Sequence, residues 1–369
     1  MLRRLRAYPM VVLLLPLVAA ILVCDRFHSL RQPWHKTAPN DTQVVLYERL
    51  SAAGLSGDEL ATTGALTLGY KESLDKDLRR HFQASGAAHV LAVSGLHTGI
   101  IYGLLLWLLT LGGRVKPRYE NRFGRRAISL FIIAAMWGYA WLTGMTPSVV
   151  RAVTMVTIFE VGRMAYRQAF SINTIAAAAV LILLVHPSDL WSVSFQLSFA
   201  ATFAIVMVAR KVEGVFHTRD LDKIWYGRII SWVTGTIVIS LAAQLGTMPL
   251  TMYYFGQIST YFLLANLLVL PIATFLVPCG LATIALGGSW LGLYVGKLTY
   301  YLAWAMNHSV EWIESLPGST VQVHIGLPMV FIYYGIVLFF LFFLRMSKKK
   351  SNFARFFIEG NSVREKKAR

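Results

Sequence analysis

The stretch HVLAVSGLHTGIIYGLLLWLLTL, residues 89–111, indicates the class of fold to which the whole chain belongs. It is apolar over about 20 residues, which is enough for a helix to cross roughly 30 Å of hydrocarbon. Its first eleven residues nevertheless hold two histidines, a serine and two glycines. Polar groups at membrane depth need partners, so this part of the stretch predicts contact with protein or water instead of lipid.

The whole chain has the composition of a membrane protein. Of its 369 residues, 56% are hydrophobic and only 14% are charged, and the mean hydropathy is +0.55. These values are too apolar for soluble domains and predict an all-α polytopic integral membrane protein. About ten apolar windows predict transmembrane helices, and they are 8–24, 88–112, 127–144, 147–165, 170–186, 190–209, 229–250, 258–286, 289–306 and 326–345.

Basic residues decide the predicted orientation. Short loops rich in Lys and Arg lie on the cytoplasmic side of a membrane. With the N-terminus inside, ten spans place most of the 35 basic residues on that side. Both termini are therefore predicted to be cytoplasmic. The net charge of +17 follows from this bias, so it does not by itself indicate nucleic-acid binding.

This topology divides the chain into four predicted regions. They are an N-terminal transmembrane anchor (1–24), a short extracytoplasmic segment ending in an amphipathic helix (25–85), a polytopic domain (86–345) and a basic, disordered cytoplasmic tail (346–369). The amphipathic helix is predicted because Leu74, Leu78 and Phe82 recur every four residues among charges. The eighth window holds Pro271 and Pro278, which predict a broken helix, either one kinked span or a re-entrant pair.

The polar start of the second window allows several readings. Ser94 and His97 are three residues apart and share a helix face, while Gly95, Gly99 and Gly103 form a four-spaced ridge. The ridge favours close helix packing, with the histidines satisfied by neighbours, and the alternative is a polar site. An intramembrane hydrolase or transferase is a third hypothesis, but AVSGL lacks the flanking glycines of a nucleophile elbow.

The segment TPSVVRA is a second polar stretch. Pro147 after Thr146 is typical of a helix start. Arg151 lies one turn further on, where it either extends outward to the interface or lines an aqueous path for an anion. Glu160 falls on the opposite side of this helix, so its predicted partner is Arg163 at i+3 and not Arg151.

The segment WSVSFQLSFAAT is a third. Ser194, Ser198 and Thr202 form a ridge of small polar residues, typical of tight helix packing in lipid. Gln196 stands off that ridge and needs a hydrogen-bond partner elsewhere.

Three further polar residues fall at predicted membrane depth. They are Gln244, Asn266 and Lys297, and Lys297 is the costliest because it carries a charge in the middle of a window. GLYVGKL around this lysine has neither the spacing nor the final Ser or Thr of a phosphate loop. No nucleotide-binding motif and no metal-ligand spacing are visible, so the sequence predicts no metal, no cofactor and no enzyme activity.

Several segments together resemble a known family. In chain order, FQASGAAHVLAVSGLHTG, TPSVVRA, NTIAAAAVLILLVHPSDLWSVSFQLSFAAT, QLGTMPL and NLLVLPIAT are similar to the competence domain of the ComEC-type DNA-uptake channel family. The resemblance covers roughly residues 65–290. It implies that positions of the motifs line or shape a channel, namely His89, Ser94, Gly95, His97, Pro147, Ser148, Arg151, Asn173, Pro187, Gln196, Ser198, Gln244, Pro249, Asn266 and Pro271.

The resemblance implies a function in natural transformation. A protein of this kind is expected to be a multi-pass channel in the bacterial cytoplasmic membrane that admits single-stranded DNA. Implied partners are the lipid bilayer, a DNA receptor, a separate nuclease, a cytoplasmic translocase ATPase and further copies of the chain. The OB-like and metallo-β-lactamase-like domains of longer members are not expected here, so no nuclease activity is predicted. The alternative is a transporter or channel for another anionic or polar substrate on the same scaffold.

Overall fold

The computed structural model describes residues 9–28, 40–91, 93–110, 122–165, 172–216, 227–337 and 339. These residues are almost entirely helical, so the predicted all-α class is confirmed. The tail predicted for 346–369 and the basic segments 3–6 and 114–121 lie outside the described residues.

The elements keep a simple order along the chain. They are α2 (Pro9–His28), α3 (Asp41–Ala52), α4 (Gly57–Leu68), α5 (Lys76–Ser85), α6 (Ala88–Leu91), α7 (Gly95–Leu109), α8 (Arg122–Leu142), α9 (Pro147–Met164), α10 (Ile172–Val185), the 3-10 helix η1 (Pro187–Trp191), α11 (Val193–Phe216), α12 (Gly227–Phe255), β1 (Gln257–Ser259), α13 (Phe262–Leu286), α14 (Trp290–Ser315) and β2 (Thr320–Gln322). A last helix follows at Leu327–Val337. The two short strands form one two-stranded sheet.

The chain forms two compact units. The larger comprises Met1–Met248 and Ile258–Gln322, and the smaller comprises Pro249–Gln257 and Val323–Arg369. Inside the smaller unit the Val323 N–H donates to the Gly256 carbonyl at 2.9 Å. The residues of the candidate site all belong to the larger unit.

Two described helices are long and apolar enough to cross a bilayer, over residues 229–255 in α12 and over the whole of α13. Other windows coincide with shorter helices. α7 has 15 residues and α10 has 14, so at 1.5 Å per residue each extends only about 21–23 Å. The number of ten crossings therefore stays a prediction.

Of the two alternatives for the eighth window, one kinked span or a re-entrant pair, the structure excludes the re-entrant pair. α13 runs as one α-helix with both prolines inside it. Each proline removes one backbone donor, but the packing of α13 against α14 and α4 holds the helix together. The Thr274 hydroxyl also donates to the Leu270 carbonyl at 2.8 Å. The interruption falls instead in the second window, between α6 and α7.

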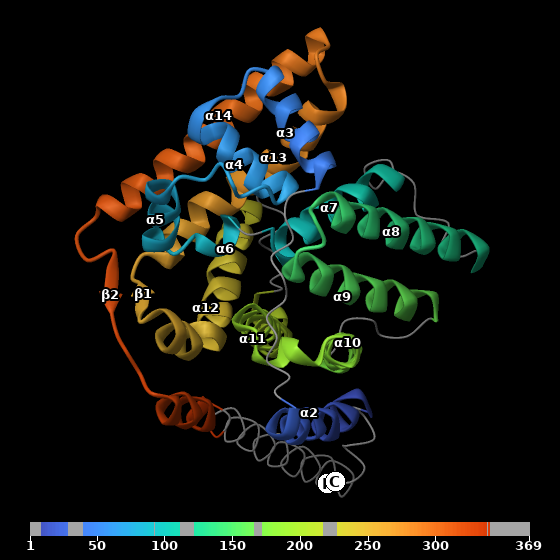
Figure 1. Ribbon diagram of the computed structural model, residues 1–369, viewed down its shortest axis with the longest axis vertical. Helices are drawn as coiled ribbons and strands as arrows, with labels where there is room; N and C mark the ends of the chain where they lie inside the picture. Colours follow the sequence, from blue (N-terminus) through green and yellow to red (C-terminus); the bar gives the residue numbers. More distant parts are fainter. Residues whose placement is uncertain are drawn as a thin grey trace, which may run out of the picture. The chain divides into compact units, whose positions relative to one another are not determined.

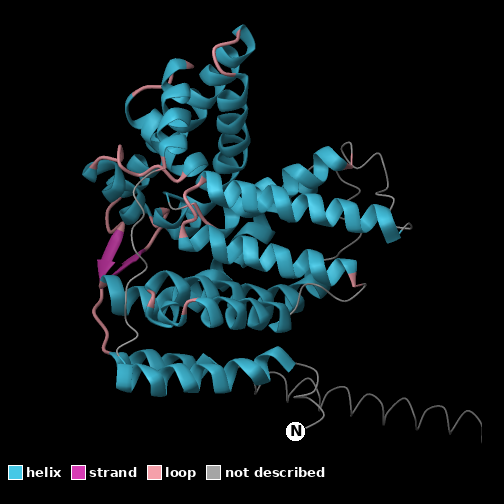
Figure 2. Cartoon of the chain, turned by 45° about the vertical axis from the view of Figure 1, so that its right-hand side comes forward, coloured by secondary structure: helices cyan, strands magenta, loops and turns pink. Residues whose placement is uncertain are grey.

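Helices α8, α9, α10 and α2 lie side by side as a stack, as Figure 1 and Figure 2 show. The contact between α8 and α9 is apolar. Ile132 and Met136 of α8 and Val149 and Val153 of α9 are fully buried, and each pair is spaced four apart so that it covers one helix face. This stack holds the start of α9 in place next to α7, which it also contacts.

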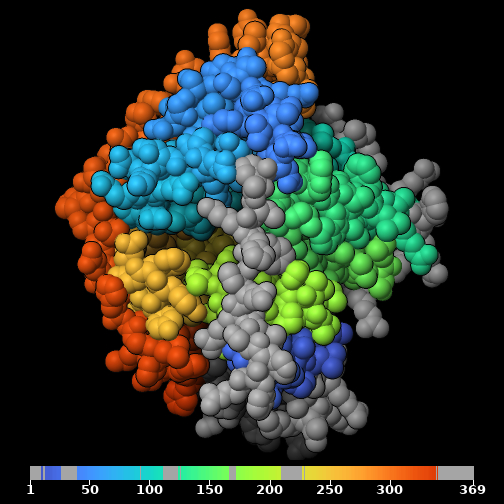
Figure 3. Space-filling model, in the orientation of Figure 1, coloured from blue at the N-terminus to red at the C-terminus, as the bar shows by residue number. Residues whose placement is uncertain are grey.

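The segment predicted to be a short extracytoplasmic stretch contains α3, α4 and α5. Every residue of α4 from Leu60 to Leu68 is buried. A glycine of α13 makes the close approach possible, because a Cβ at Gly280 would lie 2.6 Å from Thr67 Cγ2. The Gln43 side chain fastens α3 to the end of α4 by donating to the Leu68 carbonyl at 2.7 Å. Residues 40–91 form one surface that adjoins α8 and α9 in Figure 3.

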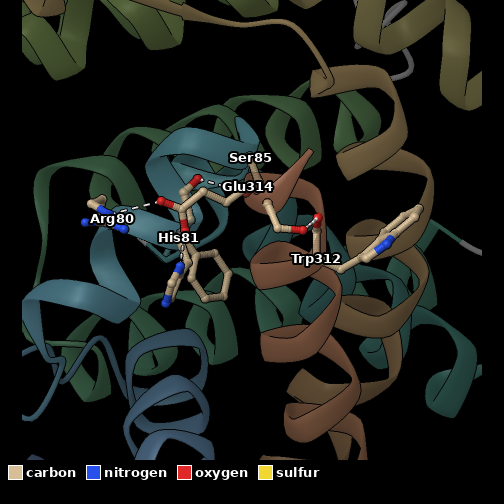
Figure 4. Close-up of polar contacts among 7 residues, drawn as sticks. Arg80, His81, Ser85, Trp312 and Glu314 are labelled. Atoms are coloured by element: carbon tan, nitrogen blue, oxygen red, sulfur yellow. Dashed lines mark hydrogen bonds and ion pairs between the residues drawn. The ribbon is translucent and has the colours of Figure 1, made fainter. Parts of the chain in front are cut away.

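The amphipathic helix is α5, which begins two residues after Leu74. The predicted apolar residues Leu74, Leu78 and Phe82 are all buried. The polar side of α5 is tied to the end of α14. Figure 4 shows Arg80 and His81 directed at the Glu314 carboxylate. Arg80 Nε donates to Glu314 Oε1 at 3.0 Å, and the His81 ring bonds to Oε2.

This contact predicts an acid-dependent loss of stability. Burial raises the pKa of Glu314, but the hydrogen bonds from His81 and Arg80 outweigh it and hold the pKa below its ordinary value of 4.5. A lowered folded-state pKa contributes stability above the unfolded value, and that contribution is lost as pH falls through the folded value. We expect Glu314→Gln to lower the thermal stability at pH 7. In acid, once Glu314 is protonated in the folded protein as well, the variant should match the wild type.

The control for this measurement is Glu311→Gln, since Glu311 is an exposed acid on the same helix. It should leave thermal stability unchanged across the same pH range. A stability difference between Glu314→Gln and the wild type that is the same at pH 7 and in acid would contradict the prediction.

Candidate functional site: a junction of three helix starts

The polar motif of the second window lies at the break between α6 and α7. Val93 and Ser94 are not helical, and Ser94 caps the start of α7. Its hydroxyl accepts from the Leu96 N–H at 3.3 Å, and its own N–H donates to His97 Nδ1 at 3.2 Å. The spacing of Ser94 and His97 is therefore that of a capping box, with histidine where Glu or Gln is usual.

The start of α9 completes this break. Pro147 opens α9 as predicted. The next residue, Ser148, donates its hydroxyl to the Val93 carbonyl at 2.7 Å. A carbonyl at a helix interruption has lost its helical partner. Ser148 supplies that partner from a helix 55 positions further along the chain.

Arg151 joins α9 to the start of α11. Its side chain is only 2% exposed, so it does not extend outward to an interface. Nη2 donates to the Ser194 carbonyl at 3.0 Å and to the Ser194 hydroxyl at 2.6 Å. Arg151 and Glu160 do not pair, as predicted, because Glu160 bonds to Arg163 at 2.7 Å instead.

The 3-10 helix η1, directly before α11, lies next to the contact between Arg151 and Ser194. Gln196 Nε2 donates to the Leu190 carbonyl at 2.9 Å, which supplies the partner that the sequence requires for Gln196 and fastens η1 to α11. Asp189 of η1 is buried. Burial holds the pKa of Asp189 above its ordinary value, although attraction to Arg151 and His186 opposes this rise.

The structure therefore gathers the first three sequence motifs at one junction. The residues that it brings together on the starts of α7, α9 and α11 are Ser94, Gly95, His97, Pro147, Ser148, Arg151 and Gln196. His89 lies close by on α6 with an exposed ring, and its Nδ1 is 3.2 Å from the Gly86 carbonyl. Ser198 follows one turn after Ser194 and is half-buried.

Four predicted site residues lie elsewhere. Asn173 accepts the Met10 N–H at 2.9 Å and so links α10 to the first turn of α2. Asn266 Nδ2 donates to the Ser240 hydroxyl at 3.0 Å, between α13 and α12. Gln244 is half-buried on α12. Lys297 is exposed on α14 among apolar side chains, and its predicted position at membrane depth stays a prediction.

The ridge of glycines on α7 is not a packing seam. A Cβ at Gly99 or Gly103 would meet nothing within 4 Å, and one at Gly95 would only touch Ala152 at 4.0 Å. The close approach occurs instead at Gly246 of α12, where a Cβ would lie 2.7 Å from the Ala200 carbonyl oxygen. The sequence has no four-spaced run of glycines around Gly246 that would have predicted this close approach.

These glycines give a matched pair of variants. We expect Gly246→Ala to destabilise the protein by about 1–3 kcal/mol, because backbone of α11 would have to move. Gly103→Ala should be neutral or stabilising by up to about 1 kcal/mol, since alanine is the better helix former. The free energy of unfolding in detergent micelles measures both, and equal losses in the two variants would contradict the assignment.

A second buried polar cluster joins α7, α8 and α9. Glu160 is fully buried and accepts from the hydroxyls of Tyr102 and Ser129, each at 2.6 Å. Arg163 Nη1 donates to Glu160 at 2.7 Å and to the Tyr102 oxygen at 3.1 Å. The sequence predicted the pair of Glu160 and Arg163 but not the two hydroxyls, whose helices are far away along the chain.

The fold and the site define an all-helical protein with long apolar helices and a buried polar junction, a class typical of membrane proteins. The chain matches the competence protein family over residues 66–348, and it belongs to that family.

Proteins from several bacteria are similar to it. ComE operon protein 3 of Bacillus subtilis (strain 168) is 25% identical over 83% of this chain and 36% of its own length. Recombination protein 2 of Haemophilus influenzae is 26% identical over 64% of this chain and 30% of its own. Competence protein ComA of Neisseria gonorrhoeae is 27% identical over 51% and 27%. The chain thus spans about a third of the length of these relatives, and no solved structure matches it.

Proposed function

We propose that this chain is a multi-pass channel of the bacterial cytoplasmic membrane that admits single-stranded DNA during natural transformation. Membership of the competence protein family supports the role in DNA uptake. The observation that carries the proposal is the junction, where three motifs far apart in sequence meet at the starts of α7, α9 and α11. A polyanion needs a hydrated path with donors and few fixed negative charges, and this junction offers donors.

The predicted membrane topology agrees with this arrangement. If α7, α8, α9, α10 and α11 cross alternately, the starts of α7, α9 and α11 fall on the same side. Contacts of Ser148 with Val93 and of Arg151 with Ser194 require that these starts be adjacent. We propose that this side is extracytoplasmic. Large apolar side chains such as Trp290, which is 74% exposed on α14, fit contact with lipid.

We also propose that the chain conducts and does not catalyse. Ser94 and His97 resemble a nucleophile and its base, with 3.1 Å between Oγ and Nδ1. The same Nδ1 accepts the Ser94 N–H, however, and His97 is fully buried. The pair is thereby engaged in capping α7. Energy and strand degradation would then come from partners, a cytoplasmic translocase ATPase and a separate nuclease.

Uptake of DNA in a deletion strain tests the proposal. Cells lacking the gene receive fluorescent double-stranded DNA, and the label that reaches the cytoplasm is counted with and without the full-length gene restored. We expect binding at the cell surface to persist and cytoplasmic label to disappear in the deletion strain. Unchanged cytoplasmic label together with a growth or envelope defect would overturn the proposal and indicate another anionic or polar substrate.

A further inference from the structure

One side of α14 carries four exposed aromatic side chains over the first four turns of the helix. They are Trp290, Tyr294, Tyr301 and Trp304. Lys297 is exposed between them, and the five residues follow one another at spacings of four, three, four and three. Such spacings keep side chains on one face of a helix. We call these five residues the aromatic face of α14.

The opposite side of α14 holds small residues and packs against the rest of the protein. The buried small residues are Gly292, Gly296, Thr299 and Ala303. A Cβ at Gly296 would lie 2.5 Å from the Ala53 carbonyl oxygen, so the two backbones come close together there. Helices in lipid approach one another through small residues of this kind. The small residues of α14 are therefore used for contacts within the chain, and the aromatic face has none.

This division argues against a second helix as the partner of the aromatic face. Trp and Tyr rings hold two helix backbones apart, whereas close packing in lipid needs small side chains. A second copy of the chain fits least, because a symmetric contact through this face would bring the two Lys297 ammonium groups to the same depth. No Asp or Glu lies between Trp290 and Trp304 to compensate for that repulsion.

Lipid fits the aromatic face better. Trp and Tyr rings favour the boundary between hydrocarbon and headgroups, because each has an apolar body and a polar edge. No carboxylate lies within 4.0 Å of Lys297 in the described part of the chain. A lysine at membrane depth extends its ammonium group toward the headgroups. Side chains on a helix lean toward its N-terminus, so we expect the Lys297 stem to run along Tyr294 toward Trp290.

We propose that the aromatic face binds the headgroup of one anionic phospholipid, with the Lys297 ammonium paired to the phosphate. The Tyr294 hydroxyl donates to the same phosphate, and the acyl chains lie along Tyr301 and Trp304. Phosphatidylglycerol is favoured over phosphatidylcholine, because Lys297 repels the choline cation. The proposal rests on the proposed function for the place of α14 in a membrane, and it does not depend on DNA as the substrate.

Native mass spectrometry of the full-length protein tests this site. The protein is released from nanodiscs that contain equal amounts of phosphatidylglycerol and phosphatidylcholine, and the lipids that stay bound are identified and counted. We expect the wild type to retain phosphatidylglycerol about fivefold more often, which is the effect of one lysine near an anionic headgroup. Equal retention of the two lipids by the wild type would contradict the proposal.

Variants of two lysines locate the site. Lys297→Met should retain both lipids equally, and Lys297→Arg should keep the preference because it keeps the charge. Lys76→Met is the matched control, since Lys76 is exposed on α5, and it should behave as the wild type. The same loss of preference in both methionine variants would overturn the site in favour of non-specific attraction to a basic protein. If Lys297→Met does not fold, Lys297→Gln takes its place with the same expected result.

The same spectra identify any other occupant of the aromatic face. A dimer, or a complex with another protein, that forms with the wild type and not with Lys297→Met would replace lipid by that partner. Normal DNA uptake in the deletion strain would refute the proposed function and leave lipid binding intact. An absent lipid preference, with uptake still dependent on the gene, would refute the lipid site alone.

Discussion

Glu160→Leu is expected to cost about 3–5 kcal/mol of folding free energy, the largest stability loss among the variants considered. Glu160 is fully buried and accepts hydrogen bonds from Tyr102, Ser129 and Arg163. Leucine fills a similar volume but leaves the cation of Arg163 without its carboxylate and two hydroxyls without an acceptor. The free energy of unfolding in mixed detergent micelles, followed by tryptophan fluorescence, measures the loss.

Glu311→Leu is the matched control for this variant. It makes the same chemical change at an exposed position of α14 and should shift the unfolding free energy by less than about 0.5 kcal/mol. A Glu160→Leu protein that unfolds at the same denaturant concentration as the control would show that the cluster of Glu160 does not hold α7, α8 and α9 together.

Ser148→Val is expected to reduce uptake of DNA into the cytoplasm by about tenfold or more, the largest functional effect among the variants of the junction. The variant removes the donor to the Val93 carbonyl, and a buried carbonyl left without a partner costs about 1–3 kcal/mol. Relaxation of the break between α6 and α7 would then shift His89 and Ser94 from their positions at the junction.

Ser148→Thr keeps the hydroxyl and should keep most of the uptake. Both variants are first checked for equal amounts in the membrane fraction. If valine and threonine at this position support the same uptake, the hydrogen bond from Ser148 is not what shapes the junction.

The sequence predicts the helices better than their interruptions. Apolar windows of about 20 residues give the positions of most helices, because hydrophobic length is a local property. The stripe of Leu74, Leu78 and Phe82 likewise predicts α5 correctly. The two prolines of α13 left open whether this window is one span or a re-entrant pair. α13 is a single helix, since packing along it outweighs the loss of the donors that the prolines remove.

Burial of α4 could not be foreseen from its residues. GDELATTGALTL is rich in threonine and begins with two acids, a composition that favours exposure. Its environment comes from α13 and α14, far along the chain, where Gly280 leaves room for Thr63 and Thr67 of α4. The Thr62 hydroxyl donates to Asn307 Oδ1 at 2.8 Å, a pairing that no pattern in α4 indicates.

The sequence predicted which residues belong to the candidate site, but it did not predict the contacts that bring them together. Motif resemblance pointed to Ser148 and Arg151, but only the fold shows that they bond to Val93 and Ser194. Residues three apart, such as Ser94 and His97, can either share a polar helix face or form a capping box. The structure shows that they form a capping box. Residues of the later motifs, such as Asn266, support other helix contacts.

Cross-linking to incoming DNA tests the central claim, passage of the strand at this junction, most directly. A photoreactive amino acid replaces His89, whose ring is exposed beside the junction, and in a second strain it replaces Trp290, which is exposed on α14. Cells are irradiated while they take up radiolabelled DNA. The account predicts labelled protein from the position of His89 and none from that of Trp290, and equal labelling or labelling at Trp290 alone would contradict it.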